Sequence, residues 1–387
     1  MIADGAIALP TWISARLPPL LTANRNRLFA HFAETMAFAA AGGTALGLAG
    51  MPGGWLSGAI LFVACAALLG RPMYVPLPLN RVIFILIGVS LGAVVTPETL
   101  HGVVTYPLSV MTLIAAMACV SWLGGVYLER IHQWDRVSAF LGAAPGGMSQ
   151  CVAVATELEA DVRAIVIVQT VRVVLIAVGL PALLTLLGLV APSSRGVGGP
   201  FSWSSLDELA ILLGLSTLAA SIAYRFRFPG GLLFGSMLAS AILHGSGWIH
   251  AVMPWWAANA AMVTLGGVTG SRFANTPVRL LLRFIGAALG SFAVSIAIAG
   301  VFAAALVVAL SLRIADVTIA FAPGSVDAMM LLALALNTDP VYVGAHHFSR
   351  IFFVSLTMPL IAKRAAQLEH KVVDESRLPP PTPDDED

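Results

Sequence analysis

Two short segments of the chain combine a helix-breaking Pro-Gly sequence with an arginine in the apolar segment that follows. The first copy contains Pro145, Gly146 and Gly147, and the second contains Pro323 and Gly324. A helix broken inside a membrane leaves backbone N–H groups without partners. Together with the positive dipole end of the next half-helix, these groups can bind a ligand, and anions suit them best. The repeated break therefore predicts a binding site for a small solute.

The two breaks belong to a longer internal repeat, because the offset that aligns them also aligns residues further along the chain. Without a gap, Asp161 aligns with Asp339 and Arg172 with Arg350. Each arginine lies inside an apolar segment, where a charge costs at least ~2.5 kcal/mol on the insertion scale. Each arginine therefore requires a polar partner.

Polar side chains near the two arginines complete the predicted site. Gln169 and His347 each precede an arginine by three residues, so each shares that arginine's helix face. Asp327 stands in the second break where the first has Ser149, and we interpret it as a candidate proton or cation coupling group, or as an arginine counter-ion. The predicted substrate-binding residues are Pro145, Gly146, Gly147, Ser149, Gln169, Arg172, Pro323, Gly324, Ser325, Asp327, His347 and Arg350.

A structural role would explain the same arginines. Arg172 and Arg350 can each hydrogen-bond carbonyl groups at the break, or pair with Asp161, Asp327 or Asp339. Both roles demand a buried positive charge, so the sequence leaves both open. The two aligned aspartates follow the breaks, and we expect them to cap the next helix.

Composition identifies the class of protein. The chain of 387 residues is 58% hydrophobic and only 11% charged, with a mean hydropathy of +0.89. A soluble domain of this size cannot bury so much apolar surface, so the chain is predicted to be a polytopic membrane protein. Its net charge of +1 and the lack of a dense basic segment argue against nucleic acid as a partner.

Sequence motifs for metal-dependent enzymes and for nucleotide hydrolysis are missing. The chain contains no His-Glu-x-x-His, Cys-x-x-Cys or Walker sequence. The sequence therefore predicts no catalytic residue, no metal site and no cofactor, and the protein is not expected to be an enzyme.

Ten apolar segments are long enough to cross a bilayer, and two more, 137–157 and 315–336, contain the Pro-Gly breaks. If both broken segments return to their own side, nearly all arginines and lysines fall on the cytoplasmic side, as the positive-inside rule requires. The fold is therefore predicted to be all-α, with two inverted repeats of five transmembrane helices, each with a re-entrant or broken helix. The ten predicted spans are 28–50, 54–70, 79–96, 107–128, 164–190, 206–224, 231–249, 254–271, 284–310 and 341–362.

These spans divide the chain into two membrane repeats with short flanking segments. Residues 1–27 are predicted to form a cytoplasmic N-terminal extension, and 28–190 the first membrane repeat. Residues 191–205 form a linker, 206–365 the second repeat and 366–387 a cytoplasmic tail.

The duplicated motifs resemble those of the bacterial membrane AbrB proteins, a duplicated integral-membrane family whose copies carry Pro-Gly-Gly followed by an aspartate and an arginine. The resemblance covers about residues 28–365, and the chain departs from the pattern where Ser325 replaces the last glycine. Family members are described as regulators of gene expression or as ammonia monooxygenases. The resemblance implies a multi-pass protein of the bacterial inner membrane. The positions of the arginines and lysines predict that both termini lie in the cytoplasm. Inverted repeats with broken segments are also similar to the cation-proton antiporter and anion transporter superfamily.

The function expected from these observations is secondary transport of a small, anionic solute that binds between two opposed hairpin tips. H+ or Na+ is the candidate coupling ion, and the lipid bilayer is the surrounding partner. One alternative is a membrane sensor or regulator of gene expression that acts through a partner protein. A third reading, an enzyme similar to ammonia monooxygenase, is disfavoured because no metal ligands are visible. The sequence leaves open the substrate, the moving bundle and whether the protein is a homodimer.

Overall fold

The computed structural model describes residues 25–94, 106–190, 206–228, 230–274 and 276–375. Within these ranges the chain forms fourteen α-helices and no strand, which confirms the predicted all-α class. The predicted linker and nearly all of the N-terminal extension lie outside the described residues.

The helices of the two halves follow the same order. The first half contains α2 (Arg25–Leu48), α3 (Gly54–Leu68), α4 (Leu77–Gly92), α6 (Tyr106–His132), α7 (Arg136–Ala143), α8 (Met148–Glu157) and α9 (Val162–Leu186). The second half contains α10 (Leu206–Arg225), α11 (Gly231–Gly245), α12 (Trp255–Gly270), the 3-10 helix η4 (Ser271–Phe273), α13 (Val278–Leu310), α14 (Ile314–Phe321), α15 (Val326–Ala335) and α16 (Pro340–Glu375). The last helix continues past the predicted end of its span at residue 362.

Four helices, α6, α9, α10 and α13, are long and apolar enough to cross a membrane. Helices α3, α4 and α11 are shorter and also apolar. Most of α10 and α13 is not buried inside the protein, so apolar side chains cover an outer surface that lipid can solvate. The chain is therefore a multi-pass membrane protein.

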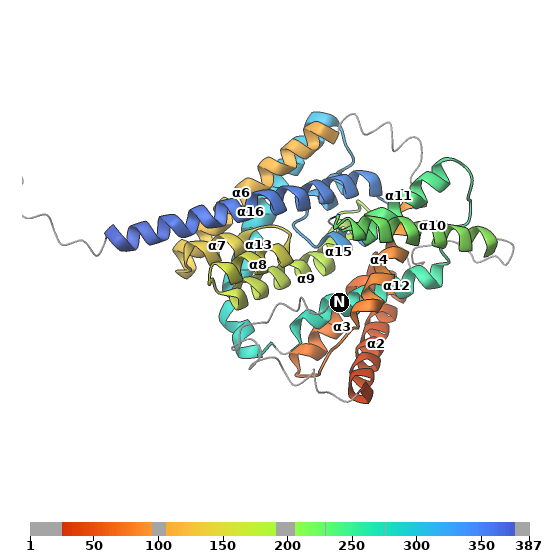
Figure 1. Ribbon diagram of the computed structural model, residues 1–387, viewed down its shortest axis with the longest axis horizontal. Helices are drawn as coiled ribbons and strands as arrows, with labels where there is room; N and C mark the ends of the chain where they lie inside the picture. Colours follow the sequence, from red (N-terminus) through yellow and green to blue (C-terminus); the bar gives the residue numbers. More distant parts are fainter. Residues whose placement is uncertain (1–24, 95–105, 191–205, 229, 275, 376–387) are drawn as a thin grey trace, which may run out of the picture.

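The helices pack into two bundles. Helices α2, α3, α4, α10, α11 and α12 form the first bundle, and α6 to α9 with α13 to α16 form the second. Figure 1 shows the first bundle on the right and below, with most of the second on the left. Contacts between the bundles include those of α3 with α9 and of α15 with α4 and α12. Each repeat therefore contributes helices to both bundles.

Glycines allow the closest helix contacts in the first bundle. A Cβ atom at Gly88 of α4 would clash with the carbonyl oxygen of Leu233 in α11. A Cβ atom at Gly266 of α12 would likewise clash with the carbonyl oxygen of Leu56 in α3. Since α4 aligns with α12 and α3 with α11, the repeat makes the same close contact twice.

Both broken segments reverse the direction of the chain. The Asp161 amide donates to Ser138 Oγ over 2.9 Å, so the first turn of α7 lies beside the start of α9. In the second repeat the Asp339 amide donates to Asp316 Oδ1 over 3.1 Å, which joins α14 to the start of α16 in the same way. Asp161 and Asp339 also accept hydrogen bonds from the first amides of α9 and α16, which confirms their predicted capping role.

A proline inside α9 ties the two bundles together. Pro181 has no N–H group, so it cannot complete the helical hydrogen bond to the Ala177 carbonyl. The buried Ser57 hydroxyl of α3 donates to that carbonyl over 2.7 Å. A side chain of the first bundle thus satisfies a backbone group that the proline leaves open in the second.

We expect Ser57→Ala to lower the thermal unfolding temperature of the purified protein. The substitution leaves the buried Ala177 carbonyl without a donor, at a cost of about 1–3 kcal/mol. The control is Thr112→Ala, because the exposed Thr112 hydroxyl bonds only the Leu108 carbonyl of its own helix. Equal unfolding temperatures for the two variants would show that the bond contributes nothing.

Candidate functional site

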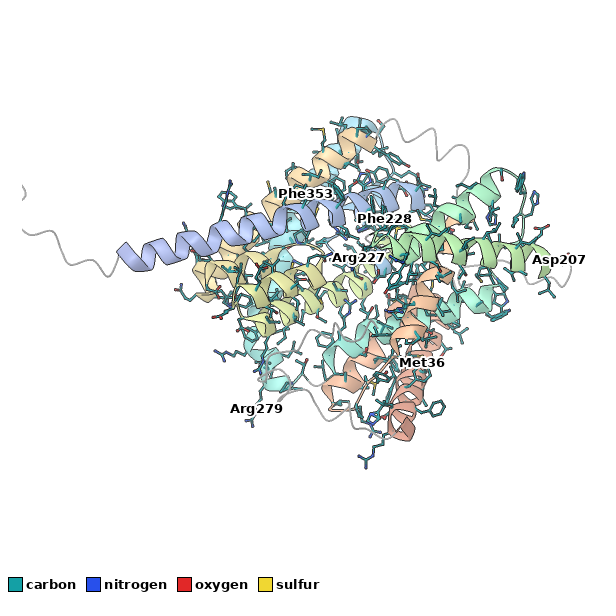
Figure 2. All side chains as sticks on the ribbon, viewed as in Figure 1. Met36, Asp207, Arg227, Phe228, Arg279 and Phe353 are labelled. Atoms are coloured by element: carbon teal, nitrogen blue, oxygen red, sulfur yellow. The ribbon has the colours of Figure 1, made fainter. Side chains whose placement is uncertain are left out.

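A cavity of about 1040 Å³ lies where the two bundles meet. The first bundle lines it with residues of α4, α10, α11 and η4 and of the segment between α10 and α11. The second bundle contributes both helix breaks, which we call the first tip (residues 144–147) and the second tip (residues 322–325), together with adjoining residues of α8, α9, α15 and α16. In Figure 2 two lining residues, Arg227 and Phe228, lie near the middle of the molecule. The cavity has the size of a site for a small organic molecule.

The first tip is built from two glycines with left-handed backbone. Gly146 has a φ of +92° and Gly147 a φ of +66°, a region that other residues adopt only with strain. Gly147 is the N-cap of α8, and glycine has no side chain that could accept a hydrogen bond from the first amides of the helix. The first amides of α8 are therefore left without the usual capping acceptor, at the positive end of the helix dipole.

The second tip has different chemistry. Ser325 has an extended backbone with a φ of −74°, and its side chain accepts a hydrogen bond from the Ala328 amide over 3.4 Å. Because this position is not left-handed, the chain does not need the glycine that the first tip has. Asp327 adds a carboxylate to the first turn of α15. The second tip is thus capped and negative, whereas the first is uncapped.

Each predicted arginine bonds the carbonyl groups at its own tip. Arg172 donates from Nη1 to the Ala143 carbonyl over 2.8 Å and from Nη2 to the Ala144 carbonyl over 2.6 Å. The side chain is only 1% exposed. Gln169, one turn earlier, donates to the Leu141 carbonyl over 2.8 Å. These side chains satisfy the carbonyls that the end of α7 leaves open.

The second repeat makes the same arrangement with a histidine. Arg350 donates from Nη1 to the Ala322 carbonyl and from Nη2 to the Gly324 carbonyl, both over 2.8 Å. Its Nη2 also lies 2.5 Å from His347 Nδ1, which must accept because a guanidinium only donates. His347 Nε2 therefore carries the proton and donates to the Ile319 carbonyl over 3.1 Å. This pattern identifies the neutral Nε2–H tautomer.

Arg350 also brings the two tips together. A Cβ atom at Gly146 would lie 3.3 Å from Arg350 Nε, so this side chain contacts the first tip while it bonds the second. The Nε groups of both Arg172 and Arg350 are buried and have no hydrogen-bond partner within the described ranges. Neither arginine forms an ion pair with a described carboxylate. Two buried positive charges thus lie near the tips without an acidic partner.

The cavity collects most of the predicted site residues. Pro145, His347 and Arg350 are buried but are not among the lining residues, and the side chain of Ser149 is outside the described part of the structure. The predicted residues that line the cavity are Gly146, Gly147, Gln169, Arg172, Pro323, Gly324, Ser325 and Asp327.

Four further arginines line the cavity: Arg81, Arg225, Arg227 and Arg272. From the sequence, these arginines served only to predict the orientation of the chain in the membrane. The Arg81 guanidinium lies 5.3 Å from the ring centre of Tyr224, which lines the same cavity. A usable signal was present in the sequence, since Arg225 and Arg227 closely precede Pro229-Gly230-Gly231, which repeats the Pro52-Gly53-Gly54 sequence at the start of α3. The described lining residues include five arginines and one acidic residue, Asp327.

Metal ligands are not grouped in the part of the chain that the structure describes. No three His, Cys, Asp or Glu side chains lie there close enough together to hold a metal ion.

Comparison with known proteins identifies relatives over most of the chain. Residues 55–366 match a protein-family model described as AbrB, "Transition state regulatory protein AbrB". "Uncharacterized protein YhjN" of Bacillus subtilis strain 168 is 28% identical over 350 residues, which cover 84% of this chain and 90% of that protein. "Putative regulator AbrB" of Escherichia coli strain K12 is 26% identical over 274 residues, which cover 70% of this chain and 77% of that protein. The family match includes both tips and both arginines.

We expect Gly146→Ala to destabilise the protein more than Gly324→Ala, its counterpart in the other repeat. At Gly146 the new side chain meets Arg350, and left-handed backbone costs a non-glycine residue about 1–2 kcal/mol. Gly324 has no positive φ, and a Cβ atom there would meet only the flexible Met329 side chain. Thermal unfolding of both variants measures the difference, and a larger loss for Gly324→Ala would contradict this account of the first tip.

Proposed function

Because the chain belongs to the AbrB family of membrane proteins, as its match over residues 55–366 shows, we propose that it is a secondary transporter of a small, anionic solute. The observation that carries the proposal is the shared cavity: two broken helices, one from each repeat, line one space between two bundles. Broken helices at the interface of repeated units are typical of transporter binding sites. The proposal assigns the protein no catalytic role.

In the proposed topology the broken segments are re-entrant hairpins and the two repeats are inverted. The hydrogen bonds from Asp161 to Ser138 and from Asp339 to Asp316 support the hairpins, since each brings the chain back to its starting side. Five spans in each repeat then give the second repeat the opposite orientation. The positive-inside rule places both termini in the cytoplasm, with the protein in the bacterial inner membrane.

The charge of the cavity supports an anion as the solute. Its arginines become more buried from the outside inwards: Arg81, Arg225 and Arg227 are exposed, Arg272 is half-buried and Arg172 is buried. Such a gradient of positive side chains attracts anions and raises their local concentration. The positive-inside rule places the four outer arginines on the cytoplasmic side, so the cavity would open to the cytoplasm.

Aligned glycines of the two repeats support alternating access. A Cβ atom at Gly53 of the first bundle would lie 2.7 Å from Leu332 and 3.6 Å from Pro181, both in the second bundle. Gly230 follows Pro229 as Gly53 follows Pro52, so the two glycines occupy matching positions in the repeats. A Cβ atom at Gly230 would meet only Phe234 of its own bundle. The bundles thus touch at one glycine and are separated by the cavity at the other. A movement that separates the bundles at Gly53 and brings them into contact at Gly230 would expose the site to the opposite side of the membrane.

A membrane sensor is the second candidate function. The Escherichia coli relative carries the printed name "Putative regulator AbrB", and the family model is described as a regulatory protein. A sensor would use the same cavity to bind a ligand and signal through a partner protein. It would bind the ligand without moving it across the membrane.

Flux through liposomes separates the two candidates. We expect wild-type protein to exchange labelled carboxylates across the membrane, and Arg272→Gln to reduce the initial rate about fivefold, because one lost charge contact is worth about 1 kcal/mol. The control is Arg279→Gln: Arg279 is exposed and lies outside the cavity lining, at the lower edge of the molecule in Figure 2. Binding by wild type with no exchange of any ligand would favour the sensor. Equal losses in both variants would reject the cavity as the route.

Asp327 is the proposed coupling group, since it is the one acid among the described residues of the cavity lining. We expect Asp327→Asn to abolish accumulation driven by an imposed H+ or Na+ gradient while anion exchange continues. The control is Asp207→Asn, because Asp207 is exposed at the far right of the molecule in Figure 2. Gradient-driven accumulation by Asp327→Asn at the wild-type level would exclude this carboxylate as the coupling site.

A further inference from the structure

We propose that the solute is an amphipathic organic acid with one acidic group and an apolar body. The acidic group would bind at the first tip, between the N-terminus of α8 and Arg172. The apolar body would lie against a surface that we call the apolar wall: Phe84 and Ile85 of α4 with Leu233 and Phe234 of α11. The inference rests on the proposed function of the cavity and adds the chemical class of its ligand.

Two independent features place the acidic group at the first tip. Helix α8 starts at Gly147 without a side-chain cap, so its first amides can donate to a ligand. Arg172 lines the same cavity, and its buried Nε group has no partner among the described residues. The second tip differs on both counts, because Ser325 already caps α15 and Arg350, whose Nε group is also unpaired among the described residues, does not line the cavity. Asp327 at this tip also repels an anion. A carboxylate therefore finds its donors at the first tip only.

The apolar wall indicates what the remainder of the ligand is. Phe84 and Ile85 face the cavity from one helix and Leu233 and Phe234 from another, while Ile351 lines it from the second bundle. An inorganic anion would leave most of a cavity of about 1040 Å³ unfilled and its apolar side chains in contact with water. A hydrocarbon body would displace that water, at about 0.8 kcal/mol for each buried CH₂ group.

The distribution of charge favours a single acidic group over two. Arg81, Arg225 and Arg227 are exposed at the rim, where water and salt screen them. A second carboxylate on the ligand would therefore gain little at the rim. If it turned inwards instead, it would meet either the apolar wall or Asp327 together with Arg272, whose opposite charges already interact with each other.

A chain-length series tests the class of ligand. The full-length protein in nanodiscs is titrated by calorimetry with acetate, butyrate and hexanoate, and with adipate, 1-hexanol and hexylamine as probes that change the charge. Empty nanodiscs correct for partition into lipid. We expect affinity to rise about fourfold per CH₂ group, which corresponds to about 0.8 kcal/mol. Hexanoate should bind at least tenfold more tightly than adipate, hexanol or hexylamine.

Substitutions in the apolar wall test whether this surface causes the rise of affinity with chain length. Phe84→Ala should reduce the gain per CH₂ group to less than twofold, with Phe234→Leu as a milder second variant. The control is Phe29→Ala, since Phe29 is 69% exposed on α2 and outside the cavity lining. Phe29→Ala should show the same gain in affinity per CH₂ group as the wild type. An unchanged gain in both wall variants would overturn the assignment of the wall.

The binding measurements test the class of ligand and the flux measurements test transport, so either proposal can be rejected without the other. Hexanoate binding with the expected length dependence but no flux would uphold the ligand class and reject transport. Flux of short dicarboxylates or phosphate with no dependence on chain length would uphold transport and overturn the inference. Equal affinities for hexanol and hexanoate would remove the anion site at the first tip.

Discussion

The structure depends on two buried guanidinium groups, each bonded to the carbonyls of a broken helix. A break inside a membrane protein leaves carbonyl groups unpaired, at several kcal/mol each in hydrocarbon. Arg172 and Arg350 each satisfy two such carbonyls and are 1% exposed. In return, the carbonyl dipoles stabilise a charge that the apolar interior would otherwise exclude. The break and the arginine therefore require each other, which explains why the duplication contains both.

Because of these bonds, the carbonyl groups and the amide groups of a break differ in whether they are free to bind a ligand. Protein side chains occupy the carbonyl end, so the bonds of Arg172 and Gln169 there are structural in the first repeat. The amide end is left for a guest only at the first tip, because Ser325 caps α15 at the second. The structural and the ligand-binding readings of the arginines are thus compatible. The bonds that hold the tip together also keep Arg172 in the cavity lining, with its Nε group unpaired among the described residues.

The sequence was sufficient to predict what depends on local chemistry. Pro-Gly pairs break helices wherever they occur, so the two breaks and the all-α class could be predicted from residues alone. The partners of Arg172 could not be predicted, because either carbonyl groups or a carboxylate can stabilise a buried positive charge. The place of Arg272 in the cavity lining was missed because its distance from the tips depends on how the two bundles meet. The contact of Ser57 with α9 was also missed, since nothing local marks a serine that donates to a carbonyl 120 residues away.

A repeated sequence need not give two identical halves in any one conformation. If the two repeats can make the same contacts between bundles, a state with the contact at Gly53 has a counterpart with the contact at Gly230. The residues that differ between the repeats then decide which state is more populated. Asp327 and Ser325 are two such differences, and both lie at the tip opposite the proposed anion site. If both states exist, a guest that neutralises the first tip, or a cation that neutralises Asp327, would therefore shift the balance between them.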